Sequence, residues 1–154
     1  MPKFFYEYLK TPIGLLAVCA TDQFVIGVDF VLKKKNSSAN KISKQAVKEL
    51  SEYFAGKREK FSVPIFYTGT AWQNKVWNKL LEVPYGSVIS YQDLAAATGK
   101  PKAARAVGQA VNKNPIAIIG PCHRVLGSRG DLVGYAGGLK KKEYLLKLES
   151  KHFD

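Results

Sequence analysis

Three predicted helices between residues 70 and 115 constrain the fold of this chain most strongly. Thr70 and Gln73 form a capping-box pattern that begins a helix running through residue 82. Ser90 is a suitable N-cap for a second helix, which ends at residue 97, and a third helix follows over 102–111. A longer helix followed by two short ones with a glycine-containing turn between them is typical of a helix-turn-helix.

The third of these helices carries almost only small side chains around one arginine, Arg105. A helix that reads base edges in the major groove is expected to carry several long polar side chains. Small residues instead suit close approach to a narrow groove, with Arg105 entering the base stack. Alternatively, the alanines pack in the core and Arg105 only meets solvent. Both interpretations can hold on different faces of the helix.

An adjacent cysteine and histidine follow this helical region. The apolar run 116–119 predicts a short buried strand, and Gly120 and Pro121 break it just before Cys122. The thiolate is a strong nucleophile, and His123 beside it is a base near neutral pH. A lone cysteine is more often a structural residue of the core, but the turn before Cys122 weakens that alternative here.

The first part of the chain reads as a small α+β unit, and we place the domain boundary between residues 68 and 69. The second domain, 69–154, holds the helical region and the Cys-His pair. In chain order the remaining predicted elements are strands at 3–10, 15–20 and 24–31, a helix at 43–55 with Ser43 as its N-cap, a strand at 61–67, a hairpin or wing at 126–132 and a helix at 139–150.

The composition of the chain limits the kinds of partner that it is expected to bind. The 154-residue chain has a net charge of +12, which favours a polyanion such as nucleic acid over other partners. Only two cysteines and two histidines are present, without metal-ligand spacing, so we expect no metal site. No segment has the length of a membrane span, and with no signal peptide we expect a cytoplasmic protein.

Several motifs together resemble the O6-alkylguanine-DNA alkyltransferases. They are PCHRV at 121–125, the run at 88–115 and GYAGGLKKKEYLL at 134–146. The stretch ELSEYFAGKREKFSVP at 49–64 resembles the N-terminal domain of that family. The resemblance implies an α+β fold, with a small ribonuclease H-like sheet and helix domain followed by a helical domain that carries a winged helix-turn-helix.

The resemblance also implies a role for individual residues. Cys122 would accept the alkyl group, and His123, oriented by Glu143, would act as its base through a water molecule. Asn114 would brace the site by hydrogen bonds, and Tyr91 would assist departure of guanine at its N3 atom. Arg105 would replace the flipped nucleotide. The other implied DNA-binding residues are Lys102, Ala103, Ala104 and Gly108; the base pocket would be lined by Tyr91, Val125, Tyr135 and Ala136.

The implied function is single-turnover DNA repair without a cofactor. A monomer would move an alkyl group from O6-alkylguanine, and also from O4-alkylthymine, to Cys122 after nucleotide flipping. Gly120 and Ala136 depart from the family pattern, and Ala136 is expected to alter the alkyl-group preference more than the activity. The alternatives are a non-enzymatic protein that binds alkylated bases, a winged-helix regulator and a cysteine hydrolase.

Overall fold

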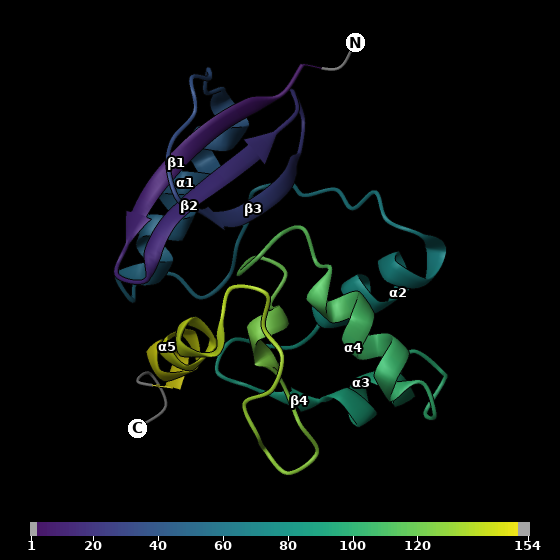
Figure 1. Cartoon of the computed structure of the whole chain (residues 1–154). Helices are drawn as coiled ribbons and strands as arrows, with labels where there is room; N and C mark the ends of the chain where they lie inside the picture. The colour runs from purple at the N-terminus through teal and green to yellow at the C-terminus, as the bar shows by residue number, and fades with distance from the viewer. Residues whose placement is uncertain (1–2, 151–154) are drawn as a thin grey trace. The chain divides into compact units, whose positions relative to one another are not determined.

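The computed structural model describes residues 3–150 and divides the chain into two compact units between Tyr67 and Thr68. Figure 1 shows a strand-rich first unit and a helical second unit. The predicted α+β class is therefore confirmed. None of the helices described between residues 3 and 150 is both long and apolar enough to cross a membrane.

The first unit is built on a three-stranded antiparallel sheet in the order β1-β2-β3. Its strands are β1 (Phe5–Thr11), β2 (Gly14–Ala20) and β3 (Val25–Val31), close to the predicted ranges. Gly14, the first residue of β2 after the turn, has a φ of 133°, a backbone conformation that residues with a Cβ rarely adopt.

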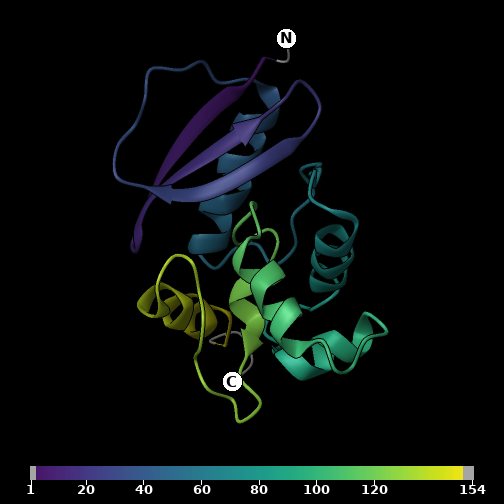
Figure 2. The same ribbon diagram turned by 45° about the vertical axis from the view of Figure 1, so that its right-hand side comes forward.

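Helix α1 (Lys41–Phe54) covers one face of this sheet, as Figures 1 and 2 both show. Alternate residues of β2 turn inward, and Leu16 and Val18 are fully buried together with Leu50 of the helix. Buried residues alternate along β2 and pack against the apolar face of α1. This alternation is the pattern that predicted the strand from the sequence. The remaining side chains of each strand point to the opposite face of the sheet.

The N-cap of α1 is Asn40 and not Ser43, so that prediction was wrong. The Asn40 side chain accepts a hydrogen bond from the Ser43 backbone N–H at 2.8 Å. Ser43 occupies the N3 position and its hydroxyl accepts from the Asn40 N–H, which completes a capping box. Asparagine and serine are both good N-caps, and Asn40 and Ser43 lie three positions apart. The sequence was therefore compatible with a helix that begins after either residue.

The predicted strand at 61–67 does not form. This segment makes one parallel bridge, between Val25 and Ile65, and is otherwise irregular. Its backbone is held instead by the buried carboxylate of Glu49, which accepts hydrogen bonds from the Ser62 N–H at 2.8 Å and the Val63 N–H at 3.1 Å. A side chain thus satisfies backbone donors that a sheet would otherwise pair.

The second unit is a set of helices with one very short sheet. Strands β4 and β5 pair in parallel over two residues each. The bounds of its elements are α2 (Ala71–Leu80), β4 (Ile89–Ser90), α3 (Tyr91–Ala97), α4 (Ala104–Asn112), a 3₁₀ turn η1 (Cys122–Arg124), β5 (Val125–Leu126) and α5 (Leu139–Ser150). The capping box of Thr70 and Gln73 and the Ser90 N-cap are confirmed.

Two tryptophans of α2 fix the position of α4. The Trp77 indole N–H donates to the Ala110 carbonyl at 2.8 Å, and the Trp72 indole N–H donates to the Ala106 carbonyl at 3.4 Å. Trp77 is buried, as expected for core packing. Its polar edge also has a partner, which is the usual condition for burying an indole. The helix of small residues is thereby tied to α2 along its length.

The strand predicted at 116–119 is not present, and residues 127–132 of the predicted hairpin or wing contain no strand residues. Residues 116–120 form consecutive tight turns with a bridge between Ala117 and Gly120. After β5 the chain folds back through a turn in which the Gly127 N–H donates to the Asp131 carbonyl at 2.9 Å. Short apolar runs do not distinguish a strand from a buried turn, because both must hide the same side chains.

Replacing Glu49 with alanine is expected to lower the free energy of unfolding by about 2–3 kcal/mol, because several donors lose a buried charged acceptor. Urea unfolding measures the difference. The control is Glu52→Ala on the same helix. Its carboxylate pairs with Arg58 at 2.9 Å at a partly exposed position, and its loss should cost less than about 1 kcal/mol. Equal costs would contradict the role given to Glu49.

Candidate functional site

The loop that leads to Cys122 is organised by the side chain of Asn114. Its amide nitrogen donates to the carbonyls of Gly120 at 2.8 Å and Ile116 at 3.2 Å. Its amide oxygen accepts from the Ile116 N–H at 3.1 Å. One side chain therefore closes the loop from both ends, and the bracing role implied for Asn114 has a concrete geometry.

Ile118 lies inside this loop with a φ of 70°. A β-branched residue in the left-handed region is unusual and costs free energy. Its side chain is almost fully buried, at 1% exposure, so burial of the side chain offsets the backbone strain. The turn lets the carbonyl of Gly120 accept from the Cys122 N–H at 2.8 Å. Cys122 is thus positioned by a strained turn and not by a strand.

Cys122 begins η1 and is buried, with 8% of its surface exposed. Burial raises the pKa of its thiol, since a thiolate is poorly solvated there. The Asn114 side chain, nearby backbone donors and the charge of Lys142 act in the opposite direction and lower the pKa. The net pKa is raised, so the resting group is a thiol and its reaction requires a base.

His123 is fully buried, and its Nε2 lies 2.6 Å from Oε2 of Glu149. Burial lowers the pKa of His123 more than Glu149 raises it, so the ring is neutral at pH 7. With the carboxylate at Nε2, the proton of the neutral ring belongs on that atom. The Nδ1 atom has no hydrogen-bond partner among the described residues, and its lone pair is available to accept a proton.

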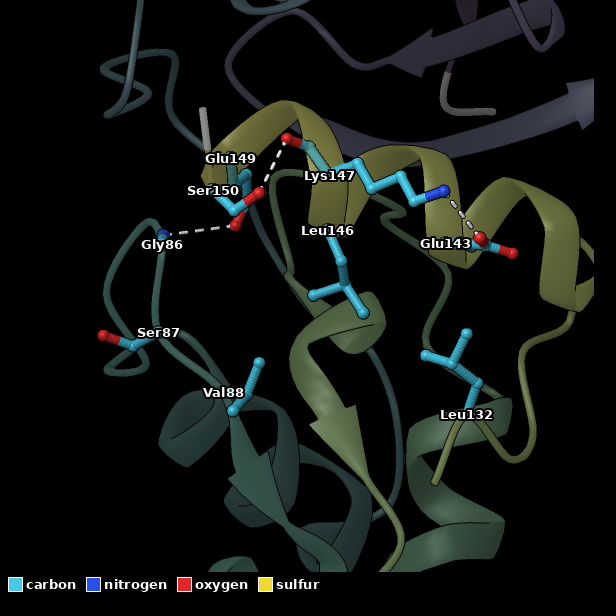
Figure 3. Close-up of a pocket in the computed structure, with 9 residues that line it drawn as sticks. All are labelled: Gly86, Ser87, Val88, Leu132, Glu143, Leu146, Lys147, Glu149 and Ser150. Atoms are coloured by element: carbon cyan, nitrogen blue, oxygen red, sulfur yellow. Dashed lines mark hydrogen bonds and ion pairs between the residues drawn. The ribbon is translucent and has the colours of Figure 1, made fainter. Parts of the chain in front are cut away.

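The carboxylate that orients His123 belongs to Glu149, so the prediction of Glu143 was wrong. Glu143 is exposed at the start of α5 and forms an ion pair with Lys147 at 2.8 Å. Figure 3 shows this pair along the helix, while Glu149 lies in the last turn beside Gly86. Both are glutamates of α5, and only the direction in which that helix packs decides which of them faces η1.

Arg124 is a buried partner that sequence reasoning missed. Its guanidinium contacts Glu149 twice, with Nε 2.8 Å from Oε1 and Nη2 3.0 Å from Oε2. A third donor, Nη1, reaches the Val83 carbonyl at 2.7 Å. Burial would raise the pKa of Glu149, but hydrogen bonds from the neutral His123 ring and from Arg124, together with the charge of Arg124, bring it down to about 2. The carboxylate therefore stays charged throughout the neutral range.

Lys142 is a second missed residue and has no exposed surface. Its ammonium group donates to the carbonyl of Val125 and to those of Val133 at 2.9 Å and Gly134 at 3.2 Å. It thereby joins β5 to the loop before α5. Burial lowers its pKa to about 8, and the nearby Cys122 acts to raise it. At pH 7 it supplies a positive charge that favours a Cys122 thiolate.

The structure brings Tyr91 to the same loop. Its hydroxyl donates to the carbonyl of Val133 at 3.1 Å and, less closely, to that of Gly134 at 3.4 Å. Burial and the nearby Cys122 both raise the pKa of Tyr91, so it remains a protonated donor. Of the other expected pocket residues, Val125 is joined to this group through Lys142. Tyr135 and Ala136 lie in the loop itself, half-buried and exposed respectively.

Helix α4 presents two different faces. Val107, Ala110 and Val111 are buried, whereas Arg105 is exposed. One face of the helix therefore packs in the core, and the entry of Arg105 into a base stack stays a prediction. A Cβ at Gly108 would meet the Tyr91 ring at 3.7 Å, an ordinary contact, so α4 runs directly past Tyr91. Ala103 and Ala104 begin the helix and are half-buried, and Lys102 precedes it at an exposed position.

A cavity of about 290 Å³, drawn in Figure 3, is lined in part by Glu149. Leu146, Leu132 and Val88 line its apolar part. Cys122 does not line this cavity, so the cavity is not a place where a nucleobase would meet the Cys122 thiol. No group of three or more histidine, cysteine or acidic side chains among residues 3–150 is placed to share a metal ion.

Comparison with known families decides where this arrangement belongs. The family model described as the DNA binding domain of 6-O-methylguanine DNA methyltransferase matches residues 71–151. The model of the ribonuclease-like domain of the same enzymes matches residues 4–67. The chain belongs to the O6-methylguanine DNA methyltransferase family. The family resemblance inferred from the motifs is confirmed.

Individual members of the family are similar over nearly their whole length. A methylated-DNA–protein-cysteine methyltransferase of Methanosarcina barkeri is 43% identical, with 96% of this chain and 98% of the relative covered. The crystal structure of Mycobacterium tuberculosis O6-methylguanine methyltransferase has a TM-score of 0.88 and 38% identity, covering 97% and 94% of the two chains. A structure of the mycobacterial protein in complex with DNA has a TM-score of 0.87, 40% identity and coverage of 95% and 92%.

Replacing Glu149 with alanine is expected to lower the free energy of unfolding by about 3–5 kcal/mol, because the buried Arg124 loses its counter-charge. Glu143→Ala, on the same helix, should leave the unfolding midpoint unchanged, since Glu143 is in solvent. Chemical unfolding at pH 7 compares the two. If the Glu143 variant were the destabilised one, the assignment of Glu149 would fail.

The same carboxylate predicts how stability varies with pH. The pKa of Glu149 is about 2 in the folded protein and about 4.3 when unfolded. Its contribution is complete above the unfolded pKa and is lost as pH falls toward 2. His123, with a lowered pKa, adds a loss that begins below about pH 6.5. The Glu149→Ala variant should lack the decline below about pH 4.5.

Proposed function

We propose that this chain repairs DNA by accepting the alkyl group of O6-alkylguanine on Cys122. The observation that carries the proposal is the Glu149–His123 pair beside a buried cysteine, in a chain that belongs to a methyltransferase family. Relatives of similar length bear the name methylated-DNA–protein-cysteine methyltransferase. The reaction forms a C–S bond at the alkyl carbon and breaks the bond from that carbon to guanine O6.

The proton of the Cys122 thiol leaves first. We assign Nδ1 of His123 as the acceptor, through one water molecule, because Nε2 is engaged by Glu149. The imidazolium that forms is buried, and the adjacent carboxylate of Glu149 stabilises it. The charge of Lys142 stabilises the thiolate at the same moment. A sulfur nucleophile is suited to displacement at an alkyl carbon, with guanine as the leaving group.

Departure of guanine is assisted by Tyr91. Its hydroxyl is protonated and is shared between two loop carbonyls at 3.1 and 3.4 Å. A hydrogen bond to guanine N3 would replace this shared bond at little cost and would stabilise the charge that develops on the base. The Val125 carbonyl accepts from Lys142 and retains a second lone pair for the guanine amino group.

The guanine must leave the duplex before it can reach a buried thiol, at a cost of a few kcal/mol. The exposed Arg105 of α4 fills the vacated position, which offsets part of that cost. The small residues Ala103, Ala104 and Gly108 allow α4 to approach the minor groove, and Lys102 adds a phosphate contact. Tyr135 and Ala136 complete the base pocket from the loop before α5.

Transfer is single-turnover, because a thioether is stable and Cys122 has no second thiol beside it among the described residues. The protein acts as a monomer and uses no cofactor. O4-alkylthymine is a second substrate, since it presents the same kind of alkyl–oxygen bond on a base that can be flipped. Ala136, at a position that is serine in some members of the family, adjusts which alkyl groups the pocket accepts.

Incubation with duplex DNA containing O6-methylguanine is expected to add one methyl group to the intact protein. Mass spectrometry measures the change, and peptide mapping should place the group on Cys122. A duplex with O4-methylthymine should give the same product more slowly. The Cys122→Ser variant, which keeps the size of the side chain, should gain no mass.

The alternatives give different results in this assay. A non-enzymatic binder of alkylated bases or a winged-helix regulator would retain the duplex without gaining mass. A cysteine hydrolase would release product repeatedly and return to its starting mass. Either outcome with the wild-type chain would refute the proposal.

Replacing Arg105 with alanine is expected to slow transfer from duplex DNA by 10-fold or more while leaving transfer from free O6-benzylguanine nearly unchanged. The reason is that only the duplex substrate requires a flipped nucleotide, whose cost of about a few kcal/mol Arg105 offsets. Rates of Cys122 alkylation on the two substrates provide the comparison. Lys113→Ala removes a charge just after α4 and is the matched control. Equal slowing on both substrates would exclude the role of Arg105 in flipping.

A further inference from the structure

The sheet face opposite α1 in the first unit carries two tyrosines of β1. Cross-strand pairing places Tyr6 opposite Cys19 and Tyr8 opposite Ala17, on the face that Leu16 and Val18 turn away from. Helix α1 covers the other face. The two tyrosines are therefore neighbours on a face that no helix of this unit covers.

A cavity of about 430 Å³ lies over these tyrosines. This is within the size range of ligand sites. The walls combine aromatic, aliphatic, basic and hydrogen-bonding side chains. They are Tyr6, Tyr8, Ala17, Val31, Leu32, Lys33, Lys35, Asn36 and Ser37. Asp29 pairs with Ala17 on the same face but does not line the cavity, so no carboxylate does.

The loop that carries the lysines is fixed to β1 by two long-range hydrogen bonds. The Lys35 N–H donates to the Tyr8 hydroxyl at 3.1 Å, and the Tyr6 N–H donates to the Ser38 carbonyl at 2.8 Å. Figure 2 shows this connection as a wide arc between β3 and α1. Leu32, at the start of the loop, is completely exposed, at 102%. The basic wall is thus held in place against the aromatic wall.

We propose that this cavity, formed by Tyr6, Tyr8, Lys33 and Lys35, binds one nucleotide of single-stranded nucleic acid. Aromatic rings bind bases by stacking without strong sequence preference, and lysines bind the phosphates beside them. The site goes beyond the proposed repair reaction and does not depend on it. It gives the first unit a nucleic-acid contact of its own.

The spacing of the tyrosines favours an unpaired strand over other anions. Residues two apart on a strand lie about 6.8 Å apart on one face. Stacked bases are separated by about 3.4 Å, so this interval matches a single base with a ring on each side. A duplex keeps its bases paired except for the one flipped toward Cys122, and it offers none to this cavity. An acidic peptide would satisfy the lysines but would leave the tyrosines without a planar partner.

The test is photocrosslinking of the full chain to a single-stranded octamer that carries 4-thiothymidine, followed by mass spectrometry of the linked peptides. We expect crosslinks in the peptide that contains Tyr6 and Tyr8. Fluorescence anisotropy of the labelled octamer gives the affinity and its dependence on salt. An octamer of abasic deoxyribose phosphates and a glutamate-rich peptide serve as competitors, and both should compete weakly.

The double variant Lys33→Gln, Lys35→Gln should reduce the salt slope of octamer binding by about 1.4, because each phosphate contact on a single strand contributes about 0.7. The matched control is Lys57→Gln, Lys60→Gln, which removes the same charge from exposed positions of this unit outside the cavity. Tyr6→Leu should weaken octamer binding by about 5-fold or more through lost stacking, and Tyr6→Phe should not.

Three results would overturn the proposal: crosslinks confined to the second unit, equal effects of the two lysine pairs, or equally strong competition by the abasic octamer or the peptide. If Tyr6→Leu fails to fold, the lysine pairs and the crosslink map still decide. Transfer from duplex DNA containing O6-methylguanine to Cys122 is measured in the same preparations. Failure of that transfer would refute the repair function and leave the single-strand site to be judged separately.

Discussion

The second unit depends on one buried carboxylate. Glu149 accepts from His123 and from two nitrogens of Arg124, and the Gly86 N–H reaches it at 3.3 Å. These contacts join the last turn of α5 to η1 and to the turn after α2. Burying such charges costs free energy that is recovered only if every donor and acceptor has a partner. Because Arg124 also reaches the Val83 carbonyl, its guanidinium is well satisfied.

The same group sets the protonation state of the His123 ring next to Cys122. A buried cysteine is protonated at rest, and the neutral His123 ring gains its positive charge only when it takes a proton next to a fixed negative charge. Lys142 acts from the other side, where it also holds Val125 and the loop that Tyr91 contacts. Glu149 thus holds the His123 ring, and Lys142, a buried ion of opposite sign, holds Val125 and the loop before α5.

Much of this architecture was predictable because it rests on local chemistry. The strands of the first unit alternate between faces, and the caps Thr70 and Ser90 begin their helices as expected. The proximity of Cys122 and His123 follows from their adjacency in the chain. The family motifs predicted the pair of short helices and the loop before α5. In each case the determining contacts lie within a few residues of one another.

The predictions were wrong where contacts between residues far apart in the sequence determine the structure. Choosing between Glu143 and Glu149 required knowing which side of α5 faces η1, and both glutamates lie in the same helix. Arg124 and Lys142 look like surface residues in the sequence, and their burial depends on partners many positions away. The segment 61–67 resembled a strand because its apolar pattern is real, but Glu49 satisfies its backbone. Ile118 gives no sequence sign of its left-handed turn.

The position of Glu149 has a consequence for synthesis of the chain. It follows His123 by 26 residues, in the last turn of α5. While a ribosome is still making that helix, His123 has no carboxylate to orient it and Arg124 has no counter-ion. Cys122 of an unfinished chain is therefore an ordinary thiol, and under the proposed mechanism it can react only after α5 is complete.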